Sequence, residues 1–377
     1  MRFRTRVLAA ALAVTSIGPS AALATSTPVQ AADPTHVLVA AGSDTTDFVM
    51  RELMTRFGTS AANVNASGSV NIPAVPTTPF VVPSDNGCAS RTYVVSGAPP
   101  TTYTSPNGST AGKNALKDPT NLTNGCIDIA RSSSGPSGSD PAGFRYFGYA
   151  KDTLSWAAFN GGRAPATLTK TQIKGIYDCS FTNWSEVGGT AGAIQRYVPQ
   201  AGSGTRAFFF SNLLDGADPS TVSSPSCPAV KVIEENKGDQ VLAADRPFAI
   251  LPYSASSWIA QANGATPNFR STATVRAITV SGTPLQPVAK PVFGKYAPNA
   301  AVVSGGQFPG ARTVFNVLHT DSLGYAEALR AVGYDTANPA TGVRSPLCNG
   351  QMATVLQKFG FTPLPANGNG ITCTLGA

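Results

Sequence analysis

Four short turns rich in serine, threonine and glycine restrict the fold of this chain more than any other feature. At least two of them join an apolar strand to a helix, so that strands and helices alternate along the sequence. Such alternation is typical of α/β proteins, in which helices pack against a sheet. The turns lie at residues 42–46, 107–112, 131–135 and 200–205.

The periodicity of apolar residues predicts the elements between these turns. In residues 47–57, for example, apolar side chains recur at helical spacing and charged side chains lie between them. Strands are expected at 36–41, 80–82, 93–96, 127–130, 154–159, 194–198 and 249–253. Helices are expected at 47–57, 113–116, 170–177, 206–214, 234–243, 322–332 and 348–359.

The beginning of a helix suits an anion, because backbone N–H groups are unpaired there and the helix dipole adds partial positive charge. Glycine lets a ligand approach the backbone closely, and serine and threonine hydroxyls add further donors. Several such turns that meet at one point would hold an oxyanion without much side-chain charge. The alternative is that each turn is an ordinary helix cap, since Ser, Thr and Asp are preferred there.

The charge of the chain argues against nucleic acid as a partner. The 377 residues include 27 Lys and Arg against 20 Asp and Glu, and the formal charge of +7 falls to +4 without Arg2, Arg4 and Arg6. The remaining basic residues are scattered and form no run. The two histidines, His36 and His319, are too few for a histidine-rich metal site. We expect neither a metal nor another cofactor.

The first 31 residues have the pattern of a signal peptide. A basic start precedes an apolar stretch, residues 7–14, that is too short to span a bilayer. Small residues offer a cleavage site before Ala32, with an earlier cut after Ala24 as the alternative. No cysteine precedes Cys88, so the lipid-bearing cysteine of a lipoprotein is not expected. The pattern predicts a secreted or extracytoplasmic protein without a membrane-spanning segment.

Six cysteines in an exported chain indicate structural disulfides. The sequence contains no C-x-x-C motif, which argues against a zinc knuckle or a redox dithiol. Many pairings are open to six cysteines, and the sequence alone does not choose among them. Ranked by proximity along the chain, the pairs would be Cys88–Cys126, Cys179–Cys227 and Cys348–Cys373.

Several segments resemble a known family. Residues 168–177 (LTKTQIKGIY) and 181–189 (FTNWSEVGG) are similar to a segment of the phosphate-binding proteins of the phosphate-specific ABC transporter. Residues 199–206 (PQAGSGTR) resemble the anion loop of the same family. Further similar loops lie at 42–46, 107–109 and 128–133. The resemblance weakens towards the C-terminus and is lost around residues 60–100.

The resemblance implies an α/β, two-lobed type II solute-binding protein fold. Each lobe would be a mixed sheet flanked by helices, with the ligand cleft between the lobes. Lobe one would comprise residues 32–149 and 253–377, and lobe two residues 150–252, after a signal peptide at residues 1–31. The lobes would close over the ligand.

Carried over position by position, the resemblance also implies a set of ligand-binding residues. They would offer hydroxyl or backbone N–H groups to the anion, and none of them would be catalytic. The set consists of Thr46 or Thr45, the backbone N–H of Asp47, Ser109, Ser203, Gly204 and Thr205. Ser133 and Arg206 complete the expected site with a hydroxyl and a guanidinium group at positions where the chain departs from the family pattern.

The chain departs from the family pattern at three ligand positions. Pro199 and Ala201 stand where the family has an anion-pairing Arg and its Asp partner, so this charge pair is absent. Ser133 stands where many members have an Asp that accepts a proton of the bound phosphate. A serine either accepts or donates, so we expect weaker discrimination against sulfate-like anions.

Three arginines are alternative sources of the missing positive charge: Arg206, Arg131 and Arg196. Each of them could also be a surface residue without a role in binding. Arg206 would then lie on a helix surface, Arg131 at a loop edge and Arg196 on the outer side of a strand. Arg206 is favoured, because it follows the turn 203–205 on the first helical turn, within reach of an anion.

These features predict an exported binding protein, not an enzyme, that captures phosphate or a similar oxyanion. Its partner would be an ABC permease at the membrane, and we expect a monomer. Without a lipoprotein cysteine, a freely diffusing or cell-wall-associated binder is a variant. The alternatives are another small anionic metabolite in the same fold, or a secreted hydrolase or phosphatase. For a hydrolase, Ser203 lies in AGSGT rather than in G-x-S-x-G, and nothing places His319 beside it.

Overall fold

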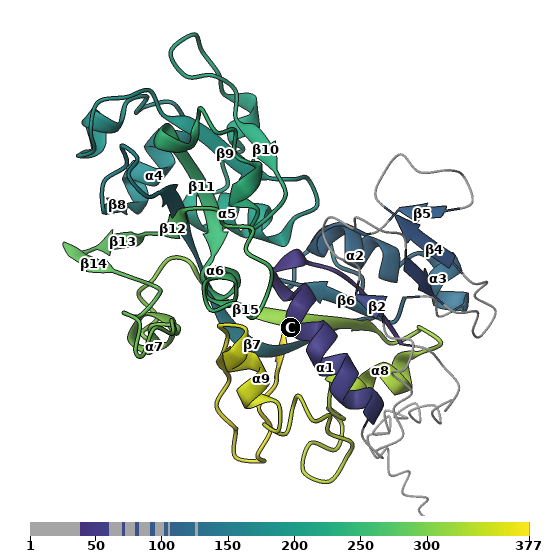
Figure 1. Cartoon of the computed structure of the whole chain (residues 1–377). Coiled ribbons are helices and arrows are strands. Elements are labelled where there is room, and N and C mark those ends of the chain that lie inside the picture. Colours follow the sequence, from purple (N-terminus) through teal and green to yellow (C-terminus); the bar gives the residue numbers. More distant parts are fainter. Residues whose placement is uncertain are drawn as a thin grey trace, which may run out of the picture.

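The computed structural model describes residues 38–59, 70–71, 80–82, 91–94, 102–104, 106–124 and 127–376, and it shows an α/β protein (Figure 1). The strands are β1 (Val39–Gly42), β2 (Val70–Asn71), β3 (Phe80–Val82), β4 (Arg91–Val94), β5 (Thr102–Thr104), β6 (Ile129–Ser132), β7 (Phe144–Phe159), β8 (Thr167–Thr169), β9 (Gln195–Pro199), β10 (Lys231–Ile233), β11 (Ala249–Ser254), β12 (Ala273–Val275), β13 (Ala277–Val280), β14 (Thr283–Leu285), β15 (Ala311–His319), β16 (Thr362–Pro363) and β17 (Thr374–Gly376). The helices are α1 (Asp47–Thr59), α2 (Ser109–Leu116), α3 (Pro119–Asn124), α4 (Lys170–Tyr177), α5 (Gly204–Leu213), α6 (Ala255–Ala262), α7 (Ala300–Ser304), α8 (Tyr325–Val332) and α9 (Ala353–Lys358).

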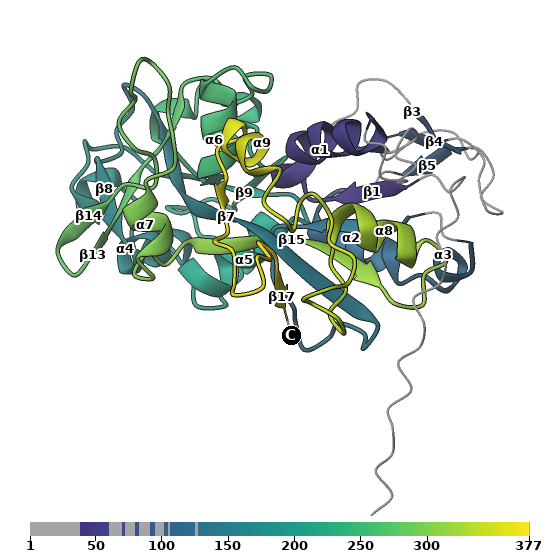
Figure 2. The same ribbon diagram turned by 90° about the horizontal axis from the view of Figure 1, so that it is seen from below.

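One sheet runs through the molecule, in the strand order β10-β9-β11-β7-β15-β6-β1-β2. The 16-residue strand β7 is its centre, since β11, β12, β15, β16 and β17 all pair with it. β15 lies antiparallel to β7, from Ala311 opposite Thr153 to His319 opposite Phe144. β7 is buried almost throughout, as expected for a strand with both faces covered. Figures 1 and 2 show it extending from one half of the molecule into the other.

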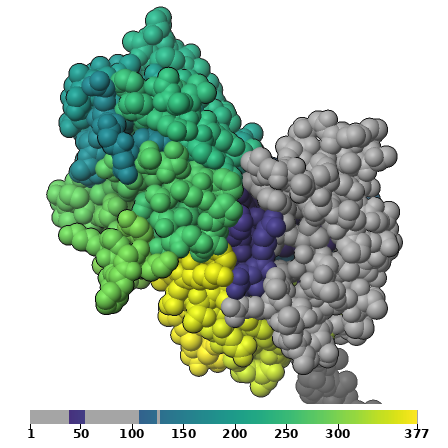
Figure 3. Space-filling view, viewed as in Figure 1, coloured from purple at the N-terminus to yellow at the C-terminus, as the bar shows by residue number. Residues whose placement is uncertain are grey.

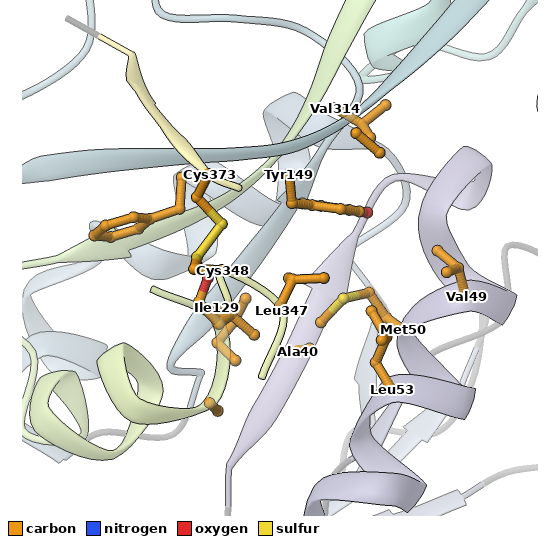
Figure 4. Close-up of a cluster of buried hydrophobic side chains, with 14 of the residues drawn as sticks. Ala40, Val49, Met50, Leu53, Ile129, Tyr149, Val314, Leu347, Cys348 and Cys373 are labelled. Carbon is orange, nitrogen blue, oxygen red and sulfur yellow. Dashed lines mark hydrogen bonds between the residues drawn. A yellow bond between two sulfur atoms is a disulfide. The ribbon is translucent and has the colours of Figure 1, made fainter. Parts of the chain in front are cut away.

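Separate groups of buried apolar side chains define two lobes. The core of the first lobe comes from β1, β6, α1, α8, α9 and the β7 residues up to Ala150 (Figure 4). The second lobe has one core around Trp156 and Trp184 and a neighbouring core around Trp258. Along β7, core membership changes between Ala150 and Leu154. The molecule is therefore two-lobed, and β7 crosses from one lobe to the other.

The packing bears on where the lobes divide along the chain. The segment 273–308 packs on the second lobe, through Val275, Ile278 and Val302. Helix α6 contributes Ile259 to a second-lobe core and Ala260 to the first-lobe core. We therefore propose that the chain returns to the first lobe at β15, rather than at residue 253. The boundary near residue 149 stays a prediction.

Two of the three expected disulfides are present. Cys179–Cys227 lies in the second lobe and Cys348–Cys373 in the first, with Cα–Cα distances of 5.9 Å and 4.8 Å. Figure 4 shows the second of these beside Leu347 and Tyr149 in the first-lobe core. The third expected pair, Cys88–Cys126, and the expected signal peptide lie outside the described residues. No free cysteine occurs among the residues that are described.

The expected helix over residues 234–243 is wrong. After β10 the chain turns irregularly, with Asn236 at a φ of 62°, and only the 3-10 turn Gly238–Gln240 is helical. The Glu234 N–H donates to the Gln240 side chain at 2.8 Å, and the Asn236 carbonyl accepts from the Tyr253 hydroxyl. These side-chain contacts replace the backbone ladder that a helix needs. Elsewhere four helices begin at other residues than expected: α2 begins at residue 109, α5 at 204, α8 at 325 and α9 at 353.

The helices are short and pack onto the lobes. α1, with 13 residues, is the longest helix in the described ranges. Its first turns lie beside both the second lobe and the C-terminal segment, as the purple, green and yellow surfaces of Figure 3 show. Across those same ranges, no helix combines the length and apolar character needed to cross a bilayer.

Candidate functional site

The four Ser/Thr/Gly turns meet at the junction of the two lobes. Within the first lobe, the Ser133 hydroxyl lies 3.1 Å from that of Ser43 and 3.4 Å from that of Ser109. Across the junction, the hydroxyl oxygens of Thr45 and Thr205 are 3.2 Å apart. All five residues are buried, Thr45 being the most exposed at 5%. We call this group, together with Ser203, the hydroxyl cluster.

Glycine at two positions allows this close approach. Gly108, the N-cap of α2, has a φ of 105°, and a Cβ there would lie 2.3 Å from the Gly202 carbonyl oxygen. A Cβ on Gly204 would lie 2.1 Å from Ser109 Oγ. The Thr110 N–H donates to the Gly202 carbonyl at 3.1 Å. The beginnings of α2 and α5 therefore face each other across the junction, where their dipoles favour an anion.

A carboxylate lies at the centre of the hydroxyl cluster. Oε1 of Glu235 accepts hydrogen bonds from the Thr45 backbone N–H (2.9 Å), the Ser43 hydroxyl (3.2 Å) and the Thr45 hydroxyl (3.4 Å). Oε2 accepts from the hydroxyl of Ser203, which accepts the Arg206 N–H at 3.0 Å as the N-cap of α5. Glu235 is completely buried. The hydroxyl cluster thus already holds one acidic side chain.

Arg312 on β15 brings a positive charge to the hydroxyl cluster. Its Nη1 and Nη2 each donate to Thr205 Oγ1 at 3.2 Å, and Nη2 donates to Thr45 Oγ1 at 3.5 Å. Asp152, directly opposite on β7, accepts from Nε at 2.9 Å and from Nη2 at 2.7 Å. Arg312 is 4% exposed and Asp152 2%. A buried ion pair therefore stands where the strands cross between the lobes, with its cation against the hydroxyl cluster.

Arg206 and Arg196 point away from the hydroxyl cluster. Arg206, favoured from the sequence, donates to the Pro199 carbonyl at 3.0 Å, and its Nη2 lies 3.8 Å from an Asp218 carboxylate oxygen. Arg196 donates to the Tyr177 carbonyl at 2.6 Å. Both guanidinium groups thus stabilise local structure of the second lobe. In the structure it is Arg312, not Arg206, whose guanidinium contacts the hydroxyl cluster.

Arg131, the third arginine considered, forms an ion pair with Asp47 beneath the turn 42–46. Both side chains are completely buried. Asp47 also accepts from Arg51 Nε at 3.1 Å, and Arg131 donates to the Gly42 carbonyl at 3.3 Å. Loss of one partner of such a buried pair costs about 3–5 kcal/mol. This pair therefore fixes the first turn against β6.

Two further groups that are expected to bind the ligand instead form hydrogen bonds within the first turn, residues 42–46. The Asp47 N–H donates to the Asp44 carbonyl oxygen in the 3-10 turn Asp44–Thr46. The Thr46 hydroxyl donates to the Ser43 carbonyl at 3.4 Å. Of the alternatives Thr45 and Thr46, the structure therefore brings Thr45 to the hydroxyl cluster.

Burial disfavours further negative charge beside the hydroxyl cluster. It raises the pKa of Asp44 to about 7, against the opposing effect of Lys237. It also raises the pKa of Glu234, although the Asn107 side chain donates to that carboxylate at 2.9 Å. An anion entering here therefore depends on the hydroxyl, N–H and guanidinium donors to offset its desolvation.

The cleft between the lobes opens beside the hydroxyl cluster. A cavity of about 520 Å³ lies between α2 and α5, and its lining includes Thr110, Ser134 and Phe208. Thr110 and Ser134 directly follow Ser109 and Ser133 of the cluster along the chain. Among the residues that the structure describes, no group of three His, Cys, Asp or Glu side chains is placed to hold a metal.

The molecule has two lobes on shared strands, and helices of the two lobes begin opposite each other at the junction. These features define the two-lobed class of solute-binding proteins. The chain matches the PBP superfamily domain over residues 28–334 and belongs to that family. It resembles the structure of an ABC-type phosphate transport receptor from Vibrio cholerae at 18% identity, with 87% of this chain and 100% of that chain covered and a TM-score of 0.51.

A second similar structure is from Clostridium perfringens, described as a phosphate ABC transporter substrate-binding protein with bound phosphate. Its identity is 15%, its TM-score 0.54, and the match covers 88% of this chain and 100% of that one. At such identities the likeness concerns the fold. No curated protein matches the chain.

Three residues of the site are not evident from the sequence. Glu235 falls in the segment interpreted as a helix, and Arg312 and Asp152 lie in strands without a recognised motif. The signal that points to Arg312 is a charged residue in the otherwise uncharged and largely apolar strand ARTVFNVLH.

Proposed function

We propose that this protein is an exported solute-binding protein that captures phosphate or a similar small oxyanion between its lobes. The observation that carries the proposal is the hydroxyl cluster at the lobe junction, together with the Thr45 N–H and the Arg312 guanidinium. Buried hydroxyl, N–H and guanidinium donors are the groups that oxyanion sites use. Both similar structures are described as phosphate transport proteins, which favours phosphate over other small anions as the ligand.

The proposed ligand-binding residues differ in part from those implied by the resemblance. The hydroxyl and N–H donors of the second, third and fourth turns are kept, Thr45 is chosen over Thr46, and Arg312 replaces Arg206 as the cation. The proposed set is Thr45, Ser109, Ser133, Ser203, Gly204, Thr205 and Arg312. Asp47 and Thr46 act by shaping the first turn.

Closure of the lobes would complete the site. Thr45, Ser109 and Ser133 come from the first lobe, Ser203 and Thr205 from the second. Because the donors are split in this way, only the closed form presents all of them to one anion. A permease of the ABC type would then receive the anion from the closed, loaded form.

The hydrolase alternative finds no support in the position of His319. Its ring packs against Phe144, with 5.6 Å between the ring centres, and burial lowers its pKa. Arg312, which contacts the hydroxyl cluster, is seven residues away on the same strand, which is roughly 20 Å. A general base for Ser203 would therefore have to come from elsewhere. We propose a binding protein without enzymatic activity.

Calorimetric titration of the purified protein with phosphate, sulfate and a sugar phosphate tests this function. Ser109→Ala removes a buried donor and should weaken phosphate binding by about 1–3 kcal/mol. Thr110→Ala, the exposed neighbour on the same helix, is the matched control and should bind like the wild type. A folded protein that binds none of these anions at millimolar concentration would contradict the proposal, and hydrolysis of a chromogenic phosphate ester would indicate the enzyme alternative.

A further inference from the structure

Glu235 is bound at the lobe junction as a ligand would be. Its two carboxylate oxygens accept from the Ser43 and Thr45 hydroxyls, from the Thr45 N–H and from the Ser203 hydroxyl. The first two residues belong to the first lobe and Ser203 caps α5 of the second lobe. The carboxylate therefore uses donors from both sides of the junction, as an anion captured by closure would.

A carboxylate and an inorganic oxyanion compete for such donors. Both present negative oxygen atoms that accept N–H and O–H groups, and a donor hydrogen serves one strong acceptor at a time. With the Glu235 carboxylate in place, a second anion at the same donors would lie in contact with it in a buried site. Like charges at such a distance in a low dielectric repel strongly. The incoming anion must therefore replace the carboxylate.

The backbone around Glu235 is held independently of its carboxylate. The Glu235 N–H donates to the Gln200 side chain at 2.9 Å. The next residue, Asn236, accepts from the Tyr253 hydroxyl through its carbonyl, and its amide oxygen accepts the Ser254 N–H at 3.0 Å. The carboxylate stands at the end of a flexible side chain on this fixed loop. It can leave the donors by side-chain rotation while the loop stays in place.

We propose that Glu235 is an internal ligand of the anion site, and that it determines affinity by competing with the external anion. Without an anion, its carboxylate holds the lobes closed over the hydroxyl cluster. An external anion binds in its place and closes the lobes in turn. This inference rests on the proposed function for the identity of the external anion, phosphate, but not for the internal closure.

Two variants and a matched control test the proposal. Glu235→Ala removes the internal ligand, and Glu235→Gln keeps its size without its charge. Glu234→Gln is the control, because it removes a carboxylate from the same loop while its amide oxygen still accepts from Asn107. Each protein is measured by small-angle scattering with and without phosphate, and by calorimetric titration with phosphate.

We expect the wild type and the Glu234→Gln control to be compact without phosphate, and Glu235→Ala to have a larger radius of gyration that phosphate reduces. We also expect Glu235→Ala to bind phosphate at least about tenfold more tightly. This factor applies when the carboxylate occupies the donors in about nine-tenths of the wild-type molecules, because only the remaining tenth is then free to bind phosphate. Glu235→Gln should change in the same direction, and it carries the test if the alanine variant does not fold. The control should stay within about twofold of the wild type.

The proposal is overturned if both Glu235 variants are as compact as the wild type without phosphate, or if their phosphate affinity is unchanged or lower. A lower affinity would mean that the carboxylate assists the anion, for instance by accepting its proton. If the Glu235 variants expand but no variant binds phosphate, the internal ligand is supported and the proposed phosphate function fails.

Discussion

Removing the guanidinium of Arg312 should separate its role in stability from its role in anion binding. Arg312→Gln leaves Asp152 buried, with one carboxylate oxygen deprived of both its donors. The other oxygen keeps the Ser254 hydroxyl and both donors of Ser256. An uncompensated buried charge of this kind costs about 3–5 kcal/mol of unfolding free energy. The double variant with Asp152→Asn should recover much of that loss, because neither charge of this ion pair is then left without its partner.

Anion binding should respond differently from stability. The Nη groups of Arg312 face Thr205 and Thr45, so the guanidinium should donate to the captured anion. Loss of a charge-assisted hydrogen bond costs about 1.5–3 kcal/mol, which is about ten- to a hundredfold in Kd. Both the single and the double variant should show this loss. Urea denaturation gives the first quantity and calorimetric titration with phosphate the second.

Arg206→Gln is the matched control, since that guanidinium binds the Pro199 carbonyl and lies near Asp218. It should bind phosphate like the wild type. If the Arg312→Gln/Asp152→Asn protein binds phosphate as tightly as the wild type, Arg312 only joins the strands and the assigned cation is wrong. If Arg206→Gln weakens binding by tenfold or more, the position of the Arg206 side chain has been misjudged.

The remaining predictions concern a hydroxyl, a buried acid and the disulfides. Thr205→Val should weaken phosphate binding by about 1–3 kcal/mol in a calorimetric titration, because it removes one hydroxyl from the hydroxyl cluster; unchanged affinity would remove Thr205 from the site. Since burial raises the pKa of Asp44 from the usual 3.8 to about 7, ionisation of this carboxyl is disfavoured in the folded state. The stability that the neutral carboxyl contributes, up to about 4 kcal/mol, is therefore present below pH 3.8 and lost as the pH rises to 7. Asp44→Asn should make the unfolding free energy, measured with urea, less dependent on pH between about pH 5 and 7.5. The same pH dependence in variant and wild type would contradict this. Thiol labelling of the denatured, unreduced protein should find no free cysteine, which includes the predicted Cys88–Cys126 pair, and two or more equivalents would refute that pairing.

The sequence predicts the parts of the site that depend on local structure. A turn such as 203–205 is determined by its own residues, because glycine permits the approach and Ser203 caps the helix that follows. The resemblance of this turn to a family loop also predicts the fold. In that fold, turns that are far apart in the chain lie close together. For this reason the sequence predicts the convergence of Thr46 or Thr45 with Ser109 and Ser133.

The rest of the site depends on how the lobes pack against each other. Local sequence patterns carry no information about that packing. Arg312 and Asp152 meet because two long strands pair in one particular register. The carboxylate of Glu235 reaches the first lobe only because its segment is an irregular turn held by contacts from Tyr253 and Gln200. The position of Arg206 on the first helical turn allows its side chain either direction, and in the structure it donates to the Pro199 carbonyl.

The central strand β7 has a consequence for how this molecule comes apart. Its first ten residues pair with β15, β16 and β17, and its last six with β11 and β12. One continuous central strand therefore belongs to the sheets of both halves, and neither half keeps a complete sheet if the other unfolds. Whatever the movement in the proposed closure, the thermal denaturation of the two lobes is coupled through shared hydrogen bonds. A substitution deep in one half thus lowers the melting temperature of the whole, and stabilisation by a bound anion reaches residues that it never touches.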